Sequence, residues 1–326
     1  MRPRKTRVRF KPQKRRGQEE KTVSIKEQLL QYLKDSGKSQ TKVAQEMGVS
    51  IPMLNQYLNG KYPNPESIEV KAQEFFAIRE MAATVSKAPD YVETSISQEA
   101  YKTIQYCHLN RCIGTYIGDA GIGKTKGAQK YALDYSEAIL VTATKACNSL
   151  KEMYKMIARK LRLSENRNKA DMERDIRSKL DGSNKILIID EAQHLSVNAI
   201  DGIRYLNDED NETYLPPVGI VFIGNHSLKT KMMGKHEELL AQLFNRIQIE
   251  RIIFTTNVLA DDIKKLFPVY VEKSMDQEIK FLHSVAKSRW GVRGAVKLFV
   301  NASNNTDISL TGLMGMSKFM GIGLAS

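Results

Sequence analysis

The sequence predicts an α/β domain built on a parallel sheet, with a small all-α domain ahead of it. Three observations support this. Short apolar runs such as "AILVT" and "KILIID" are continuous, as strands buried on both faces of a parallel sheet require. The glycine-rich stretch "GDAGIGKT" follows one such run and opens a helical pattern. The segments before and after this region show helical periodicity without strand-like runs.

The first segment is strongly basic. Residues 1–16 carry nine lysine or arginine residues and no acidic residue, within a net charge of +13 for the whole chain. Because such a segment cannot bury a core, we expect a disordered arm through residue 21. Its charge favours contact with nucleic-acid phosphates, through residues such as Arg4, Arg7 and Arg9. A solubilising or localising tail is the alternative.

The remaining composition indicates a cytoplasmic protein without a membrane partner. No apolar run approaches the roughly 18 residues of a membrane span, and no secretory signal is recognisable. The three cysteines, Cys107, Cys112 and Cys147, show no CxxC spacing. Neither a disulfide framework nor a zinc site is therefore expected.

Residues 22–83 predict a small helical domain. Ser24 begins the first helix with a capping-box pattern, and Ser39 and Ser50 begin two short helices joined at Gly48. Two short helices joined by a glycine turn are typical of a helix-turn-helix. A fourth helix follows, with Pro65 at its first position.

This domain resembles the Cro/C1 (Xre) family of phage-repressor-like DNA-binding domains. The resemblance implies that Ile51, Pro52, Asn55 and Gln56 face the major groove, with Gln40 and Lys42 near phosphates. Because the recognition helix has no arginine to pair with guanine, we expect weak or shape-based DNA binding. A protein-interaction module of the same fold is the alternative. The matching residues are Gln40, Ala44, Gly48, Val49, Leu54, Leu58, Asn59 and Gly60.

"CIGTYIGDAGIGKT" predicts a strand, a phosphate-binding loop and the start of a helix. The glycines allow backbone N–H groups to surround phosphates, Lys124 reaches the β and γ oxygens, and Thr125 ligates Mg²⁺. ATP and Mg²⁺ are therefore the expected cofactors. The expected nucleotide contacts are Gly118, Asp119, Ala120, Gly121, Ile122, Gly123, Lys124 and Thr125, together with Asp190.

Two further strands end in polar residues suited to ATP hydrolysis. In "KILIIDEAQHL", the apolar run is followed by Asp190 and Glu191. Asp190 is expected to hold Mg²⁺ with Thr125, and Glu191 is expected to orient or deprotonate the attacking water. In "VGIVFIGNH", the predicted strand is followed by Asn225, which can hydrogen-bond the γ-phosphate or that water. The pattern predicts an ATPase.

These motifs resemble the AAA+ superfamily of P-loop NTPases, with 118–125 as Walker A, 186–191 as Walker B and Asn225 as sensor 1. The resemblance implies that Arg246, before a strand in "AQLFNRIQIERI", is an arginine finger completing a neighbouring subunit's site; Arg251 is the second choice. It also implies that Arg293, in "GVRGAVKL", is sensor 2 and reports the γ-phosphate through closure of a three-helix lid. Ordinary surface arginines are the alternative at both positions.

"IIDEAQHL" further resembles the AAA+ branch containing the Mu B, TnsC and ExeA-type proteins, and the domain order is most similar to that of Mu B. This implies assembly as oligomers or filaments on duplex DNA, largely independent of sequence. It also implies target selection for a DDE-type transposase, which stimulates ATP hydrolysis and hence disassembly. Lys145, Lys151 and Lys155, expected on one helix face, are candidate phosphate contacts, with a solvated surface as the alternative.

Other functions share parts of this pattern. A nucleotide-regulated repressor would use the helix-turn-helix as its main reader of DNA. A replication initiator or loader shares the core but usually carries its DNA-binding domain after the lid. A two-domain helicase needs a longer chain, and an ExeA-type ATPase usually brings a membrane or peptidoglycan-binding segment. The expected segments are the arm (1–21), helix-turn-helix domain (22–83), linker (84–95), AAA+ core (96–257), helical lid (258–310) and C-terminal tail (311–326).

Overall fold

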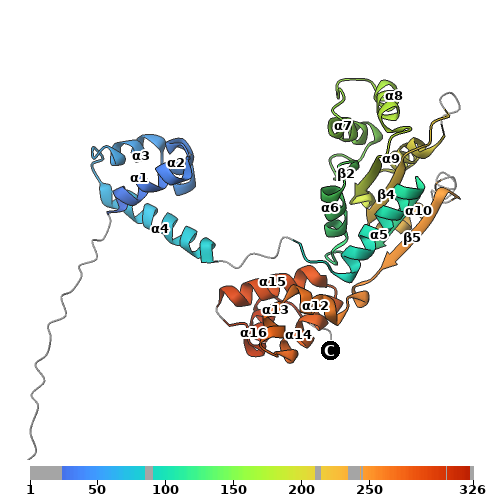
Figure 1. Cartoon of the computed structure of the whole chain (residues 1–326). Coiled ribbons are helices and arrows are strands. Elements are labelled where there is room, and N and C mark those ends of the chain that lie inside the picture. The colour runs from blue at the N-terminus through green and yellow to red at the C-terminus, as the bar shows by residue number, and fades with distance from the viewer. Residues whose placement is uncertain are drawn as a thin grey trace, which may run out of the picture. The chain divides into compact units, whose positions relative to one another are not determined.

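The computed structural model describes residues 24–84, 91–209, 214–233, 243, 245–305 and 307–323. The chain divides into two compact units, Met1–Val85 and Ser86–Ser326 (Figure 1). Each unit is described by itself. The predicted DNA contacts Arg4, Arg7 and Arg9 lie outside the described residues.

Four helices form the described part of the first unit, and each predicted helix is present. Ser24, Ser39 and Ser50 each accept a backbone N–H at the start of a helix, and Gly48 makes the turn with φ 66°. The core of this unit packs around Leu29, Ala44 and Leu54, which are fully buried. The helices are α1 (Ile25–Ser36), α2 (Gln40–Met47), α3 (Ile51–Leu58) and α4 (Pro65–Thr84).

The second unit is built on a five-stranded parallel sheet with strand order β2-β3-β4-β1-β5. β1, β3 and β4 are buried along their whole length, as their continuous apolar sequences require. These findings confirm the predicted α/β fold. The strands are β1 (Ile113–Gly118), β2 (Ala138–Thr142), β3 (Ile186–Asp190), β4 (Gly219–Gly224) and β5 (Ile247–Ile253).

Helices cover the sheet. Along β3, Ile186 and Ile188 pack into one apolar cluster while Leu187 and Ile189 pack into another, so two separate cores lie on the two faces. The helix before β1 was not predicted from the sequence. The helices of this layer are α5 (Ser95–Asn110), α6 (Lys124–Asp134), α7 (Leu150–Lys160), α8 (Lys169–Leu180), α9 (Val197–Arg204) and α10 (His226–Met233), with short 3-10 turns η1 (Ala192–His194) and η2 (Tyr205–Asn207).

A helical lid follows β5, and it differs from the expected three helices in one way. Pro268 begins an extra short helix, because it cannot continue the preceding one. The sequence leaves the segment after residue 310 open as a last packed helix or a partner-binding segment. In the structure it contains α16, whose Leu310 N–H donates to Glu278 at 2.9 Å and whose Leu313 is buried in the core. The elements are η3 (Thr255–Asn257), α12 (Ala260–Leu266), α13 (Pro268–Glu272), α14 (Asp276–Lys287), α15 (Gly291–Asn304) and α16 (Leu310–Phe319).

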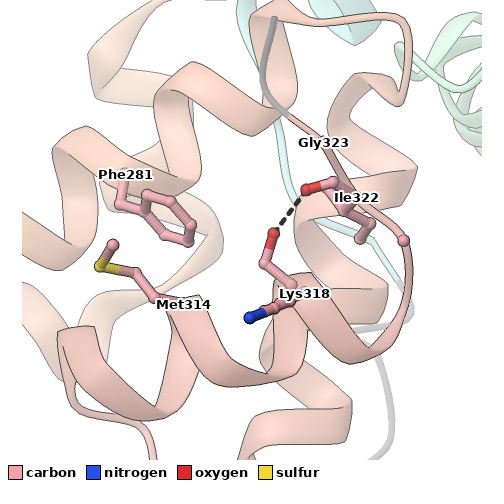
Figure 2. Close-up of a pocket in the computed structure, with 7 residues that line it drawn as sticks. Phe281, Met314, Lys318, Ile322 and Gly323 are labelled. Carbon is pink, nitrogen blue, oxygen red and sulfur yellow. Dashed lines mark hydrogen bonds between the residues drawn. The ribbon is translucent and has the colours of Figure 1, made fainter. Parts of the chain in front are cut away.

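The lid contains a cavity of about 410 Å³ between α14 and the end of α16 (Figure 2). Phe281 and Met314 form its apolar wall, and Ser317 Oγ donates to the carbonyl of Ile322 at 2.7 Å beside it. No predicted site residue lines it. Among the described helices, none combines the length and apolarity needed to cross a bilayer.

Candidate nucleotide site

The strand order brings three predicted motifs to one edge of the sheet. The phosphate-binding loop follows β1, Asp190 and Glu191 lie at the end of β3, and Asn225 follows β4. Because β4 lies between β3 and β1 and all strands are parallel, these carboxyl ends meet at one edge. Asn225 therefore lies between the phosphate-binding loop and the carboxylate pair.

The loop has the shape that an anion site needs. Gly121 and Gly123 adopt φ values of 77° and 105°, which side-chain-bearing residues rarely adopt. Lys124 begins α6 and donates from Nζ to the carbonyl oxygens of Gly118 at 2.7 Å and Asp119 at 2.6 Å. Burial lowers the pKa of Lys124, while Glu191, Asp190 and Asp119 oppose this shift. A helix N-terminus, open N–H groups and an ammonium thus converge at this loop.

Asp190 and Thr125 provide oxygen atoms at the same edge. Asp190 is 2% exposed, and its Oδ1 accepts the Glu191 N–H at 2.9 Å. Burial raises the pKa of Asp190, and a hydrogen bond from the Thr125 side chain opposes this shift. Carboxylate and hydroxyl oxygens suit Mg²⁺, which commonly takes its other ligands from phosphates and water. The described residues contain no group of three or more His, Cys, Asp or Glu side chains that could hold a metal ion.

Glu191 and Asn225 are both held by local hydrogen bonds. Glu191 adopts a left-handed conformation with φ 54°, and its Oε2 accepts from Gln193 Nε2. The side-chain oxygen of Asn225 accepts from the backbone N–H of Ser227 at 2.9 Å and from its hydroxyl at 2.5 Å. The start of α10 therefore fixes the orientation of Asn225.

The side chain of Asp119 makes contacts within the protein. Its Oδ2 accepts the Thr255 N–H at 2.7 Å, and its Oδ1 lies 3.2 Å from His226 Nε2. The His226 ring stacks on Phe254 with centroids 4.8 Å apart. The carboxylate of Asp119 therefore fastens the loop to the segment after β5 and lies beside His226 after β4.

The lid reaches the loop through the first turn of α15. The Arg293 N–H donates to the carbonyl of Gly121 at 2.9 Å. A Cβ on Gly291, which has φ 62°, would lie 2.9 Å from the carbonyl oxygen of Ala120. This close approach places the exposed Arg293 beside the phosphate-binding loop.

Arg246 lies at the opposite edge of the sheet. It precedes Ile247, which pairs with Ile113 at the start of β1, whereas Gly118 pairs with Ile253 at the other end. A strand of this length spans about 20 Å. Arg246 Nη1 lies 2.7 Å from Asp208, which Arg204 also binds at 2.9 Å. Arg246 is therefore remote from the loop of its own subunit. The alternative residue, Arg251, lies 3.6 Å from Glu99.

The predicted DNA contacts of the described residues are placed differently in the two units. In the helical unit, all six predicted side chains are exposed, and Asn55 Oδ1 accepts from Asn59 Nδ2 at 2.7 Å. The expectation of three lysines on one helix face was wrong: Lys145 lies in the loop after β2, because α7 begins only at Leu150. Lys151 is exposed on α7, and Lys155 pairs with Glu152 at 2.9 Å. The six exposed residues are Gln40, Lys42, Ile51, Pro52, Asn55 and Gln56.

Two residues beside the site, and the partner of Arg246 at the opposite edge, were not predicted from the sequence. Gln193 contacts Glu191, Lys231 binds the carbonyls of Gln193 and Leu195, and Asp208 binds Arg246. The phrase "DEAQ" contained Gln193, but no sequence signal indicated the partner of its side chain.

Comparisons with known proteins agree with this architecture. The family model described as an AAA domain matches residues 108–232, and one described as helix-turn-helix matches residues 29–70. The chain is similar in fold to the crystal structure of Cdc6p from Pyrobaculum aerophilum, with a TM-score of 0.50 at 15% identity over 73% of this chain and 70% of that one. Sheet, motifs and lid define an AAA+ ATPase with an N-terminal helix-turn-helix domain.

Two relatives define the family more closely. The chain is 30% identical to the Mu-like prophage FluMu DNA transposition protein B of Haemophilus influenzae, over 83% of this chain and 93% of that protein. It is 26% identical to the ATP-dependent target DNA activator B of Escherichia phage Mu, over 77% of this chain and 79% of that protein. The chain belongs to the Mu B family of transposition ATPases.

Proposed function

We propose that this protein is an ATP-dependent DNA-binding ATPase that assembles on duplex DNA, selects target DNA and delivers it to a DDE-type transposase. The observation that carries the proposal is that Arg246, assigned as the arginine finger, lies far from the phosphate-binding loop of its own subunit. The phosphate-binding loop lies at one edge, and Arg246 lies at the other. A second subunit is then needed to bring the arginine finger, Arg246, to the nucleotide, so ATP binding and assembly depend on each other.

Each site residue has a role in this proposal. The loop and Lys124 bind the phosphates, and Asp190 and Thr125 hold Mg²⁺, which supplies charge neutralisation when bound. Glu191 orients or deprotonates the attacking water, and Asn225 contacts the γ-phosphate or that water. Arg293 senses the γ-phosphate from the lid. Arg246 leaves Asp208 and reaches the nucleotide of the neighbouring subunit, and hydrolysis then favours disassembly.

DNA contact is assigned to the exposed face of α2 and α3 and to the lysines after β2. The relatives' names, a DNA transposition protein and a target DNA activator, support this assignment. The exposed side chains of α3, among them Asn55 and Gln56, are polar or apolar but carry no positive charge. Because α3 has no arginine or lysine to donate to guanine O6 and N7, we expect DNA binding that is largely independent of sequence. Arg4, Arg7 and Arg9 would add phosphate contacts.

The same helix-turn-helix favours a second candidate, a nucleotide-regulated repressor. The two functions differ in the DNA that they prefer. We expect a labelled random-sequence duplex to bind at least about tenfold more tightly with a slowly hydrolysed ATP analogue than with ADP, measured by fluorescence anisotropy. Unlabelled random duplex should compete as well as any other sequence. One sequence bound roughly a thousandfold more tightly in either nucleotide state would favour the repressor.

A further inference from the structure

Gln193 joins two parts of the nucleotide site that come from neighbouring strands. Its side-chain Nε2 donates to Glu191 Oε2 at the end of β3, and its Oε1 accepts the backbone N–H of Asn225 after β4, at 3.2 Å. One side chain therefore connects the carboxylate assigned to the attacking water with the backbone of the residue assigned to the γ-phosphate.

The hydrogen-bonding groups at both ends determine which side chain can make this connection. A backbone N–H only donates, and an ionised carboxylate only accepts. The connecting side chain must therefore offer an acceptor to Asn225 and a donor to Glu191, as the amide of Gln193 does. Glutamate has the same shape, but when ionised it would place a second carboxylate against Glu191.

Residues of α10 and β4 hold the turn that carries this amide and leave space for the amide. Lys231 on α10 donates from Nζ to the backbone carbonyls of Gln193 at 2.7 Å and Leu195 at 2.5 Å. A Cβ on Gly224, the last residue of β4, would lie 2.8 Å from Gln193 Oε1. The glycine thus leaves the room that the amide occupies, and α10 holds the turn that carries it.

We propose that Gln193 is a positioning residue for ATP hydrolysis: it orients the Glu191 carboxylate and ties that orientation to the backbone of Asn225. A change at Asn225 on engagement of the γ-phosphate then reaches Glu191 through a single side chain. This inference rests on the proposed ATPase function and adds to it a link between the residue that senses the γ-phosphate and the residue that acts on water.

The test uses full-length Gln193→Glu and Gln193→Ala, with Gln129→Glu as a control that makes the same charge change at an exposed position on α6. ATP hydrolysis is measured with duplex DNA over a range of ATP concentrations. Equilibrium binding of a fluorescent ATP analogue and the midpoint of thermal unfolding are measured in parallel. We expect kcat to fall roughly tenfold to a hundredfold in both Gln193 variants, because Glu191 is no longer oriented. Gln193→Glu should be at least as impaired as Gln193→Ala.

The binding measurement separates positioning from nucleotide binding. KM and the Kd for the analogue should stay within about twofold of the wild-type values, since the contacts of Gln193 run to Glu191 and Asn225. The inference would be overturned if Gln193→Ala had the same kcat as the wild type. It would also be overturned if the affinity for the analogue fell by the same factor as the rate. A wild-type protein that neither binds the analogue nor hydrolyses ATP would instead contradict the proposed function itself.

Discussion

Glu191→Gln is expected to lower kcat for ATP hydrolysis by about a hundredfold or more while ATP still binds. The substitution keeps the size of the side chain and its ability to accept a hydrogen bond from Gln193, but it removes the negative charge that would orient or deprotonate water. If hydrolysis drives disassembly, complexes of this variant with ATP and DNA should also last longer. Single-turnover hydrolysis and the rate of release from labelled duplex measure the two effects.

Two results would contradict different parts of this prediction for Glu191. Hydrolysis at the wild-type rate would show that another group activates the water. A slow rate accompanied by rapid release from DNA would retain Glu191 as the catalytic carboxylate but would separate hydrolysis from disassembly. Gln129→Glu, at an exposed position of the same domain, should match the wild type in both measurements.

Lys124→Ala is expected to abolish ATP-dependent assembly. The Lys124 ammonium already lies within hydrogen-bonding distance of two loop carbonyls, at 2.7 and 2.6 Å, where it can turn to the β and γ oxygens. Losing hydrogen bonds from a charged donor costs about 3 kcal/mol, which weakens ATP binding about a hundredfold. Equilibrium binding of a fluorescent ATP analogue, and sedimentation with duplex DNA, measure both effects.

A mixing experiment shows which subunit supplies the arginine. Lys124→Ala lacks a working loop but retains Arg246, while Arg246→Ala retains the loop. If the arginine acts on the neighbouring subunit, mixing the two inactive variants should restore part of the ATPase activity. No recovery, or full activity of Arg246→Ala alone, would contradict the role assigned to Arg246. Lys126→Ala, at an exposed position on α6, provides the control for a lost lysine charge beside the loop.

The sequence predicted those elements whose own residues indicate how they are buried. The strands at Ile186–Asp190 and Gly219–Gly224 are continuous apolar runs and are buried throughout. α5 was not predicted, because its buried face includes the polar residues Thr103 and His108, which interrupt the apolar stripe. His108 is satisfied there by Tyr131 Oη at 2.7 Å, a contact that only the folded chain brings about.

In the candidate site, too, some features were predictable from the sequence and others were not. The loop and the Asp190–Glu191 pair are contiguous motifs, so their chemistry is visible in the sequence. The contacts that position these groups join distant segments. Gln193 meets Asn225 only because β3 and β4 are neighbours, and Asp208 meets Arg246 only because η2 lies near the start of β5. Strand order and register therefore had to be known first.

Negative-stain electron microscopy can show whether ATP controls assembly on DNA. The purified protein is imaged with random-sequence duplex DNA in the presence of a slowly hydrolysed ATP analogue or ADP. We expect continuous oligomers or filaments on DNA with the analogue and none with ADP. Isolated particles at one DNA sequence, or the same appearance in both nucleotide states, would contradict it.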